Sequence, residues 1–331
     1  MNMAEMVGAE RLERGLWWNG PWSLIEGCSP VSPGCDHCWA AAAAHMRQYQ
    51  KNPKVRAANE GLTYVDDYER PYFTGVVRTR PDLLDLPIRT RTPTAWSVWD
   101  DLFHPDVPNE FIAAAFGVMM FTPWHAYVWC TKRAARMRDW FKWFIGTGTM
   151  ARYLDPMMLG PEMLGRAGVV VTEKRALQAN VYWKAHFDQS KRGLCDLPVP
   201  WPLPNLITMV TAEDQQRADE RIPLLLDTPS ACRAVAIEPC LGPVSLYNAA
   251  RDYLGNLGRH GGPVIQRGLD WVIIGQETGR HARKAEIGWF RSVRDQCVAA
   301  GVPLFCKASP QGKSIIDGET WRQFPSIGKA V

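Results

Sequence analysis

Short apolar runs alternate along the chain with segments whose apolar residues recur at helical spacing. Continuous apolar runs of this kind are typical of parallel strands that are buried on both faces of a sheet. We predict strands at residues 22–26, 75–78, 94–99, 126–131, 206–213, 233–238, 269–277 and 302–307. We predict helices at residues 38–50, 108–121, 132–144, 214–226 and 287–300. Eight strands that alternate with helices indicate an α/β fold, a complete or partial (β/α) barrel.

Two segments interrupt this alternation. Residues 146–204 are rich in Gly, Pro, Met and Trp and contain one strand-like run, at 169–171, so we expect an insertion packed on the barrel. Residues 51–70 are polar, and we expect a loop or a lid there. Neither segment marks a domain boundary, so the prediction is a single barrel domain over residues 1–331.

Composition narrows the class of protein without identifying its function. Hydrophobic residues make up 46% of the chain and charged residues 22%, as in ordinary globular proteins. No apolar run reaches the ~18 residues that a membrane span needs, and the first residues show no apolar signal-peptide core. We therefore expect a cytoplasmic protein with no membrane contact. The net charge of +4 is weak support for a nucleic-acid partner.

The strongest chemical signal is a loop with three cysteines, Cys28, Cys35 and Cys38, placed after the first strand and before a helix. Proline and glycine within the loop bend the chain, so that three thiolates can converge on a metal. Thiolates select zinc, copper(I) or iron–sulfur clusters. A zinc ion would need a fourth ligand, for which His37 and His45 are candidates. Three protein ligands with one open position are typical of a catalytic site.

The remaining cysteines occur singly, and we expect most of them to be buried. They are Cys130, Cys195, Cys232, Cys240, Cys297 and Cys306. A conventional electron-transfer cluster would need one of them as a fourth ligand, and Cys130 or Cys240 could lie near the loop in space.

A three-cysteine loop after the first strand of a (β/α) barrel resembles the radical S-adenosylmethionine (SAM) superfamily. That resemblance implies a barrel of the radical SAM type, in which Cys28, Cys35 and Cys38 hold a [4Fe–4S] cluster. The open iron would bind S-adenosylmethionine, and an external electron donor would reduce the cluster. The spacing here is CxxxxxxCxxC, whereas the superfamily commonly has CxxxCxxC. The position before the last cysteine, usually aromatic there, is His37, and Trp39 follows that cysteine.

More narrowly, the chain resembles a family carried largely by phages and prophages and related to spore photoproduct lyase. Shared residues at the loop are Gly27, Cys28, Val31, Ser32, Gly34, Cys35, Cys38 and Ala40. Shared motifs further on are Asp101-Leu-Phe-His104, Thr131-Lys-Arg133, Ala218-Asp-Glu-Arg221, Glu238-Pro, Leu241-Gly-Pro243, Leu269-Asp-Trp-Val272 and Arg294-Asp-Gln-Cys297. The chain departs from that family at Gln276, where a second glycine is common, and at residues 211–212, where Ser-Val is common.

Charged residues stand at the carboxyl ends of the predicted strands, where a (β/α) barrel builds its active site. They are Asp100, Asp101, Lys132, Glu213, Glu238, Glu277 and Lys307. We expect Glu213 and Glu238 near the cofactor, and Lys132, Glu277 and Lys307 nearer the substrate as catalytic residues. Basic residues at 132–138 and 280–284 are candidates for phosphate contacts. Most of the 15 tryptophans should be core, and one or two at the rim could stack on a base.

The expected function is therefore a radical SAM enzyme acting on a nucleic-acid base or nucleotide. The phage resemblance implies an isomerase that rearranges an amino-acid-modified thymine in phage DNA within the bacterial host, with duplex DNA as a candidate form of the substrate. One alternative is a radical lyase that repairs a DNA lesion. Another is a zinc-stabilised, non-enzymatic nucleic-acid-binding protein. The sequence does not determine the oligomeric state.

Overall fold

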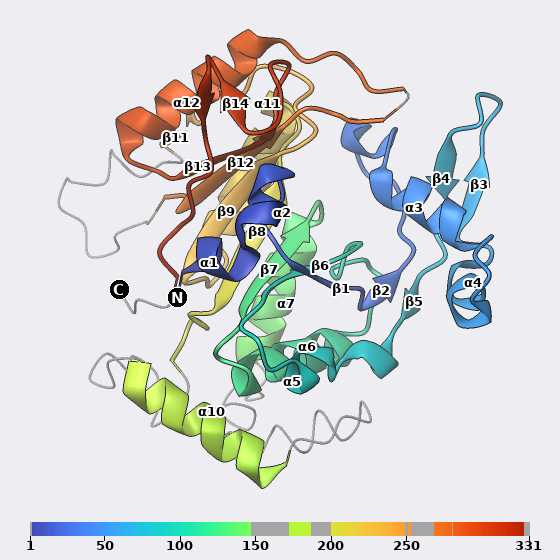
Figure 1. The fold of residues 1–331 in the computed structure, drawn as a ribbon, viewed down its shortest axis with the longest axis vertical. Helices are drawn as coiled ribbons and strands as arrows, with labels where there is room; N and C mark the ends of the chain where they lie inside the picture. Colours follow the sequence, from blue (N-terminus) through green and yellow to red (C-terminus); the bar gives the residue numbers. More distant parts are fainter. Residues whose placement is uncertain are drawn as a thin grey trace.

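Seven parallel strands form the centre of the computed structural model, which describes residues 2–146, 172–186, 200–248, 251–252, 268–279 and 281–327. The strands are β1 (Gly20–Trp22), β6 (Ala95–Val98), β7 (Ala126–Thr131), β8 (Leu206–Thr211), β9 (Cys232–Ile237), β12 (Trp271–Gly275) and β13 (Leu304–Ala308). They pair in that order, and the sheet curls into a partial barrel (Figure 1). Among the described strands no pairing joins β1 to β13, so the barrel is open. The α/β prediction and the partial form of the barrel are confirmed.

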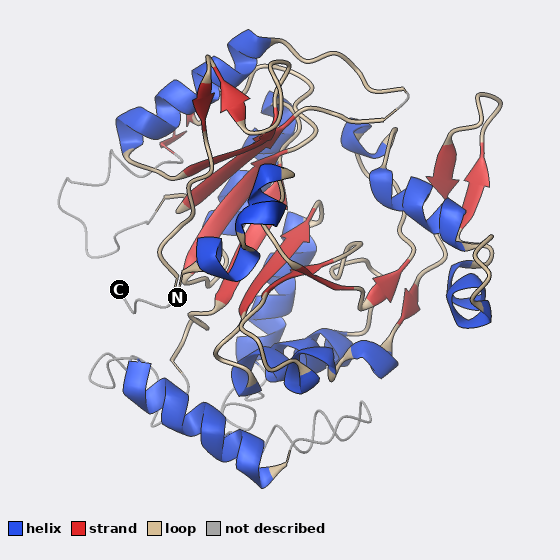
Figure 2. Ribbon diagram, in the orientation of Figure 1, coloured by secondary structure: helices blue, strands red, loops and turns tan. Residues whose placement is uncertain are grey.

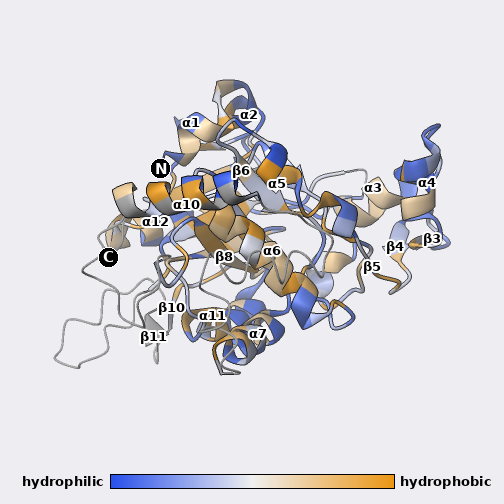
Figure 3. Cartoon of the chain, turned by 90° about the horizontal axis from the view of Figure 1, so that it is seen from below, coloured by the Kyte–Doolittle hydropathy of each residue, from blue (hydrophilic) through white to orange (hydrophobic). Residues whose placement is uncertain are grey.

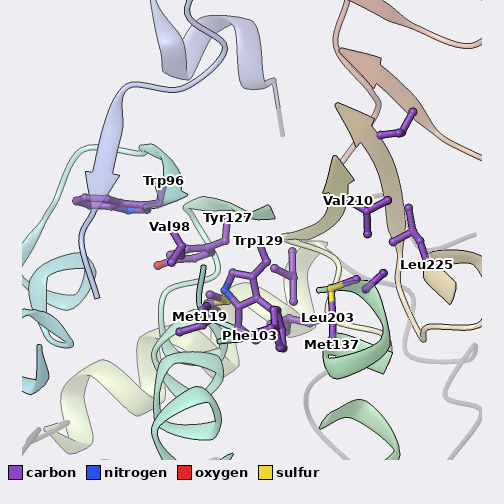
Figure 4. Close-up of a cluster of buried hydrophobic side chains, with 14 of the residues drawn as sticks. Trp96, Val98, Phe103, Met119, Tyr127, Trp129, Met137, Leu203, Val210 and Leu225 are labelled. Carbon is purple, nitrogen blue, oxygen red and sulfur yellow. The ribbon is translucent and has the colours of Figure 1, made fainter. Parts of the chain in front are cut away.

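Helices cover the outer, convex face of the sheet, as Figure 2 shows. They are α6 (Asn109–Phe121), α7 (Ala134–Gly146), α11 (Gln215–Leu226) and α12 (Ile287–Ala300), with the short α5 (Leu86–Arg89) beside α6. Eleven consecutive residues of α6 are buried, which accounts for its predominantly hydrophobic colour in Figure 3. Figure 4 shows the core beneath these helices, where Trp129 packs against Phe103 and Trp140, with ring centroids 5.5 and 5.6 Å away.

The inner face carries a second core, which closes the amino end of the barrel. Successive strand residues point to opposite faces, so Ala234 and Ala236 of β9 face inward while Val235 and Ile237 face the helices. Helix α1 (Met3–Val7) packs on the first residues of β6 and β7, and α2 (Ala9–Glu13) follows it. Because α1 fills this end, the carboxyl ends of the strands are left to form a site.

A smaller lobe built from residues 39–79 lies to one side of the sheet (Figure 1). It contains α3 (Trp39–Arg47), α4 (Pro53–Asn59) and a hairpin of β3 (Thr63–Val65) and β4 (Pro71–Phe73). The polar segment 51–70, expected as a loop or lid, is thus a helix and most of a hairpin. The amino end of α4 carries an ordinary start signal, in which Asn52 caps the helix and Pro53 is its first residue.

Two predicted barrel strands are wrong, one in part and one entirely. Of the predicted strand at 22–26, only Trp22 lies in the sheet, and residues 25–26 form a separate strand outside it. Residues 75–78 do not join the sheet; instead β5 (Arg78–Thr79) pairs antiparallel with β2 (Ile25–Glu26). The apolar part of that run is Val76 and Val77 alone, and Val76 is 43% exposed, so the run is too short to cross a buried sheet. The remaining short strands form two hairpins: β10 (Tyr247–Asn248) with β11 (Arg251–Asp252), and β14 (Ile315–Ile316) with β15 (Glu319–Thr320).

Part of the predicted insertion at 146–204 is described as helix α10 (Glu173–His186). It packs on α6, where the buried Trp183 donates its Nε1–H to the carbonyl of Met120 at 3.0 Å. The strand-like run at 169–171 lies outside the described residues. Within the described part of the chain, no helix is long and apolar enough to cross a membrane.

Candidate functional site

A pocket opens at the carboxyl ends of the strands, bordered on one side by the three-cysteine loop. Cys28, Cys35 and Cys38 all line it, so the three predicted metal ligands lie together. Six of the seven predicted strand-end residues line it as well: Asp100, Asp101, Lys132, Glu238, Glu277 and Lys307. Glu213, the seventh, does not line the pocket and contacts the loop at Gly34.

The path of the loop depends on a glycine at its start. Gly27 adopts φ +94°, and a Cβ there would lie 2.1 Å from the carbonyl oxygen of Val76. Its N–H donates to Asp100 Oδ2 at 3.1 Å. A short 3₁₀ turn at Pro33–Cys35 then reverses the chain, and Cys38 directly precedes α3. Glycine, turn and helix start together bring three thiols to one pocket.

Asp101 and Arg133 form the first of three ion pairs that hold this loop. Arg133 Nη1 donates to Asp101 Oδ2 at 2.7 Å, and both side chains are buried. The same guanidinium donates to the carbonyl of Ser29 at 2.8 Å and lies 3.6 Å from Cys28 Sγ. His104 contacts the Ser29 hydroxyl at 2.8 Å. The start of the loop is therefore fixed to the segments that follow β6 and β7.

Glu213 and Arg221 form the second pair. Glu213 is fully buried, and Arg221 Nη1 donates to its Oε2 at 3.0 Å and to the carbonyl of Thr211 at 2.9 Å. The other oxygen, Oε1, accepts from the backbone N–H of Gly34 at 3.4 Å. Burial acts to raise the pKa of Glu213, but the Arg221 charge, the Ser32 hydrogen bond and the Lys132 charge together outweigh it, and the pKa lies below its usual value. Glu213 thus holds the residue next to Cys35.

Glu277 and Arg283 form the third pair. Arg283 donates to both carboxylate oxygens, and His37 Nδ1 lies 2.8 Å from Oε2. Arg283 also donates to the carbonyl of Pro33 at 2.8 Å and pairs with Asp36 at 3.2 Å. Burial acts to raise the pKa of Glu277, yet the Arg283 hydrogen bonds lower it to about 2. This pair holds the loop between Cys35 and Cys38.

The three ion pairs are the part of the site that sequence reasoning missed. It identified the carboxylates of Glu213 and Glu277 but expected them to contact cofactor and substrate. Arg133 and Arg221 close two of the motifs quoted above, Thr131-Lys-Arg133 and Ala218-Asp-Glu-Arg221, so a signal was present. Their role was not visible, because the contacts that each pair makes with the loop join residues far apart in sequence.

Two cationic groups face the pocket from the strand ends. The Lys307 ammonium pairs with the Glu238 carboxylate across β12, where Gly275 leaves room for both. A Cβ on Gly275 would lie 3.3 Å from the Glu238 carboxyl carbon and 3.4 Å from Lys307 Cβ. Lys132 has no hydrogen bond or ion pair from its ammonium to any described residue. Burial acts to lower the pKa of Lys132, but the acidic groups around it, of which Cys35 and Glu213 act most strongly, together outweigh burial and raise the pKa.

The donor set of the pocket consists of thiols, which suit a thiophilic metal ion or an iron–sulfur cluster. Burial raises the pKa of Cys28 to about 12 and also raises that of Cys38, so metal binding would have to displace these protons. Among the described residues, no three His, Cys, Asp or Glu side chains converge as the ligands of one ion would.

Neither candidate fourth zinc ligand points its Nδ1 to the thiols. His37 Nδ1 contacts Glu277, and His45 Nδ1 lies 2.8 Å from Gln48 Nε2 and 3.3 Å from Thr63 Oγ1. Of the single cysteines, Cys130 lines the pocket and Cys195 lies outside the described residues. The others are buried, as expected: Cys232, Cys240, Cys297 and Cys306.

The fold and site define a class of protein: an open (β/α) barrel with a three-cysteine pocket at the carboxyl ends of its strands. A family model described as a protein of unknown function (DUF5131) matches residues 15–325. The chain therefore belongs to that family. The match spans every strand of the sheet and all three ion pairs. No curated protein and no solved structure matches the chain.

Proposed function

We propose that the protein is a radical SAM enzyme whose barrel is of the radical SAM type, with a [4Fe–4S] cluster held by Cys28, Cys35 and Cys38. The single observation that carries the proposal is that these three thiols line one pocket at the carboxyl ends of a parallel, open barrel. When bound, such a cluster supplies an electron that cleaves S-adenosylmethionine to a radical able to remove a hydrogen atom. An external donor supplies that electron.

The ion pairs serve this function by holding the loop before any cofactor binds. A preorganised ligand set loses less conformational entropy on binding than a free loop. Arg133 and Lys132 also bring positive charge beside the thiols, which favours their anionic form. Glu213 and Glu277, first expected at cofactor and substrate, are here positioning residues.

The groups left for ligands are Glu238, Lys307 and Lys132. Glu238 can accept hydrogen bonds from the amino or hydroxyl groups of S-adenosylmethionine, with Lys307 holding its carboxylate in place. Lys132 offers an unpaired ammonium to a carboxylate or phosphate on the cofactor or substrate. The proposed substrate is a nucleic-acid base, and isomerisation of a modified thymine is the favoured reaction. Cleavage of a pyrimidine lesion is the alternative, since the same groups would serve both.

The first test is iron binding and cofactor cleavage. Protein purified without oxygen and reconstituted with iron and sulfide should hold about four irons per chain. It should release 5′-deoxyadenosine when given dithionite and S-adenosylmethionine. Cys35→Ala should lose both properties, whereas Cys297→Ala, which removes a thiol from α12 outside the pocket, should keep them. One tightly bound zinc, no iron uptake and no cofactor cleavage would favour the zinc-stabilised binding protein instead.

A further inference from the structure

The segment that follows the last loop cysteine carries an unusual distribution of charge. Residues 39–59 contain Arg47, Lys51, Lys54 and Arg56 and no aspartate or glutamate, so this segment alone has the +4 charge of the whole chain. Lys51, Lys54 and Arg56 are exposed, and no side-chain hydrogen bond or ion pair joins them to another described residue. Such a surface attracts a polyanion.

Large apolar side chains stand exposed along the same segment. Trp39 is 52%, Met46 69% and Tyr49 72% exposed. Trp39 and Met46 lie two turns apart on one face of α3, about 10 Å along its axis. The opposite face, with Ala41 and Ala44, packs on Phe73 of the hairpin and fully accounts for the burial of α3. The exposed face therefore does not contribute buried side chains to the hydrophobic core.

This surface is continuous with the pocket. Trp39 lines the pocket directly after Cys38, and its ring packs edge-to-face on Trp99 at 5.1 Å. Trp99 in turn lies under the Arg47 guanidinium, 5.3 Å from its ring centroid. Aromatic rings and cations thus alternate from the pocket outward along α3 to the start of α4. Figure 1 shows α3 and α4 beside each other at this side of the molecule.

We propose that residues 39–59 bind a strand of single-stranded DNA and lead it to the pocket, with Trp39 and Tyr49 stacking on bases and Lys51, Lys54 and Arg56 contacting phosphates. The inference rests on the proposed function, since it names the polymer that brings a base to the site. Aromatic side chains with interleaved cations are how proteins hold unpaired strands, because every base has a π-face. A protein partner fits less well, because lysine is depleted at protein interfaces.

Binding of a labelled oligothymidylate of about 12 nucleotides to the full chain, followed by fluorescence anisotropy, tests this. Trp39→Ala and Tyr49→Ala should each weaken binding about 5- to 100-fold, as loss of one base stack does. Lys51→Ala with Lys54→Ala should lower the slope of log affinity against log salt by about 1.4, because each phosphate contact on a single strand contributes about 0.7. A duplex of equal length should bind more weakly.

Tyr68→Ala is the matched control. Tyr68 is also 72% exposed but lies in the hairpin turn beside Asp66, Asp67 and Glu69, so its loss should leave affinity unchanged. Equal effects of Tyr49→Ala and Tyr68→Ala, or none from Tyr49→Ala, would overturn the proposal. It would also be overturned if polyglutamate bound as tightly and without dependence on Tyr49, which would indicate an acidic protein partner.

The binding assay separates this inference from the proposed function. It needs neither iron nor cofactor cleavage, and it can be run on protein before and after cluster reconstitution. DNA binding that depends on Tyr49, in a protein that takes up no iron, would refute the radical SAM proposal alone. Cofactor cleavage in a protein whose DNA binding ignores Trp39 and Tyr49 would refute this inference alone.

Discussion

At the scale of single residues, the charged groups of the site divide by their partners. Asp101, Glu213 and Glu277 are each neutralised by an arginine. Arg133 and Arg283 also contact the cysteine loop directly, whereas at the second pair it is Glu213 that accepts from the loop N–H of Gly34. Glu238 is paired with a lysine that faces the pocket instead. An arginine can donate several hydrogen bonds from one planar group, so it can hold a carboxylate and a loop carbonyl at once. Arginine therefore neutralises the carboxylates that hold the loop, and lysine neutralises the carboxylate that faces the pocket.

Glu277→Gln should destabilise the protein in a pH-dependent way. The pKa of Glu277 is about 2 when folded, below its usual 4.5, so its carboxylate stabilises the fold above pH 4.5. That contribution disappears as the pH falls from 4.5 toward 2. We expect urea unfolding at pH 7 to show a loss of about 2 kcal/mol in the variant. The difference in free energy of unfolding between variant and wild type should shrink as the pH is lowered below 4.5.

The exposed Glu60 provides the control for this experiment, since Glu60→Gln removes a carboxylate that has no ion pair among the described residues. It should change stability by less than ~0.5 kcal/mol. If the stability difference between Glu277→Gln and wild type stayed constant from pH 7 to pH 3, the ionised carboxylate would not be the stabilising form.

At the scale of elements, the cysteine loop is positioned at both ends by backbone geometry. Gly27 lets the chain leave β2 in a left-handed conformation that few other residues adopt. Cys38 then directly precedes α3, which packs on the hairpin. Ion pairs hold the residues between these ends, so the loop needs little regular structure of its own.

Gly27→Ala should be far more costly than Gly61→Ala. Both glycines have positive φ, +94° and +71°, so both variants pay about 1 kcal/mol of backbone strain. Only at Gly27 would the new Cβ also meet backbone, 2.1 Å from Val76 O, whereas nothing lies within 4 Å at Gly61. We expect about 1–3 kcal/mol of additional destabilisation in Gly27→Ala, measured by urea unfolding. Equal losses would mean that the loop shifts freely to make room.

At the scale of the whole molecule, the open barrel is completed by chain segments rather than by strand pairing. Residues before β1 lie against β13, where a Cβ on Gly15 would meet the carbonyl oxygen of Lys307 at 2.4 Å. Trp17 packs edge-to-face on Trp271 of β12, with ring centroids 5.9 Å apart. The amino-terminal segment thus links the two edges of the sheet and forms one wall of the pocket.

Trp17→Ala should therefore destabilise the molecule as a unit. Trp17 is 7% exposed, and removal of a buried tryptophan costs about 3–5 kcal/mol. Chemical unfolding followed by far-ultraviolet circular dichroism should show one transition shifted to lower denaturant. Tyr68→Ala, which removes an exposed ring, should change the free energy of unfolding by less than ~0.5 kcal/mol. An unchanged midpoint in Trp17→Ala would show that the segment is not part of the cooperative core.

The sequence by itself determined the elements with strong local patterns. The strand at 126–131 and the helix at 287–300 match β7 and α12 in both bounds, because burial on fixed faces imposes a periodicity that the residues must follow. The three cysteines were equally visible, since their chemistry and spacing are local. The run at 75–78 was misassigned because two valines carry too little pattern to tell a sheet strand from a short edge pair.

Tertiary structure alone decided what the charged residues do. Arg133 and Arg283 reach the loop from distant parts of the chain, and Arg283 meets Pro33 across 250 positions of sequence. Arg221 holds Glu213, whose other oxygen accepts from Gly34 of the loop. Whether the barrel closes, and which carboxylates face the pocket, also depend on contacts between distant segments. A local pattern indicates which face of an element is buried, but it does not indicate which distant segment packs against that face.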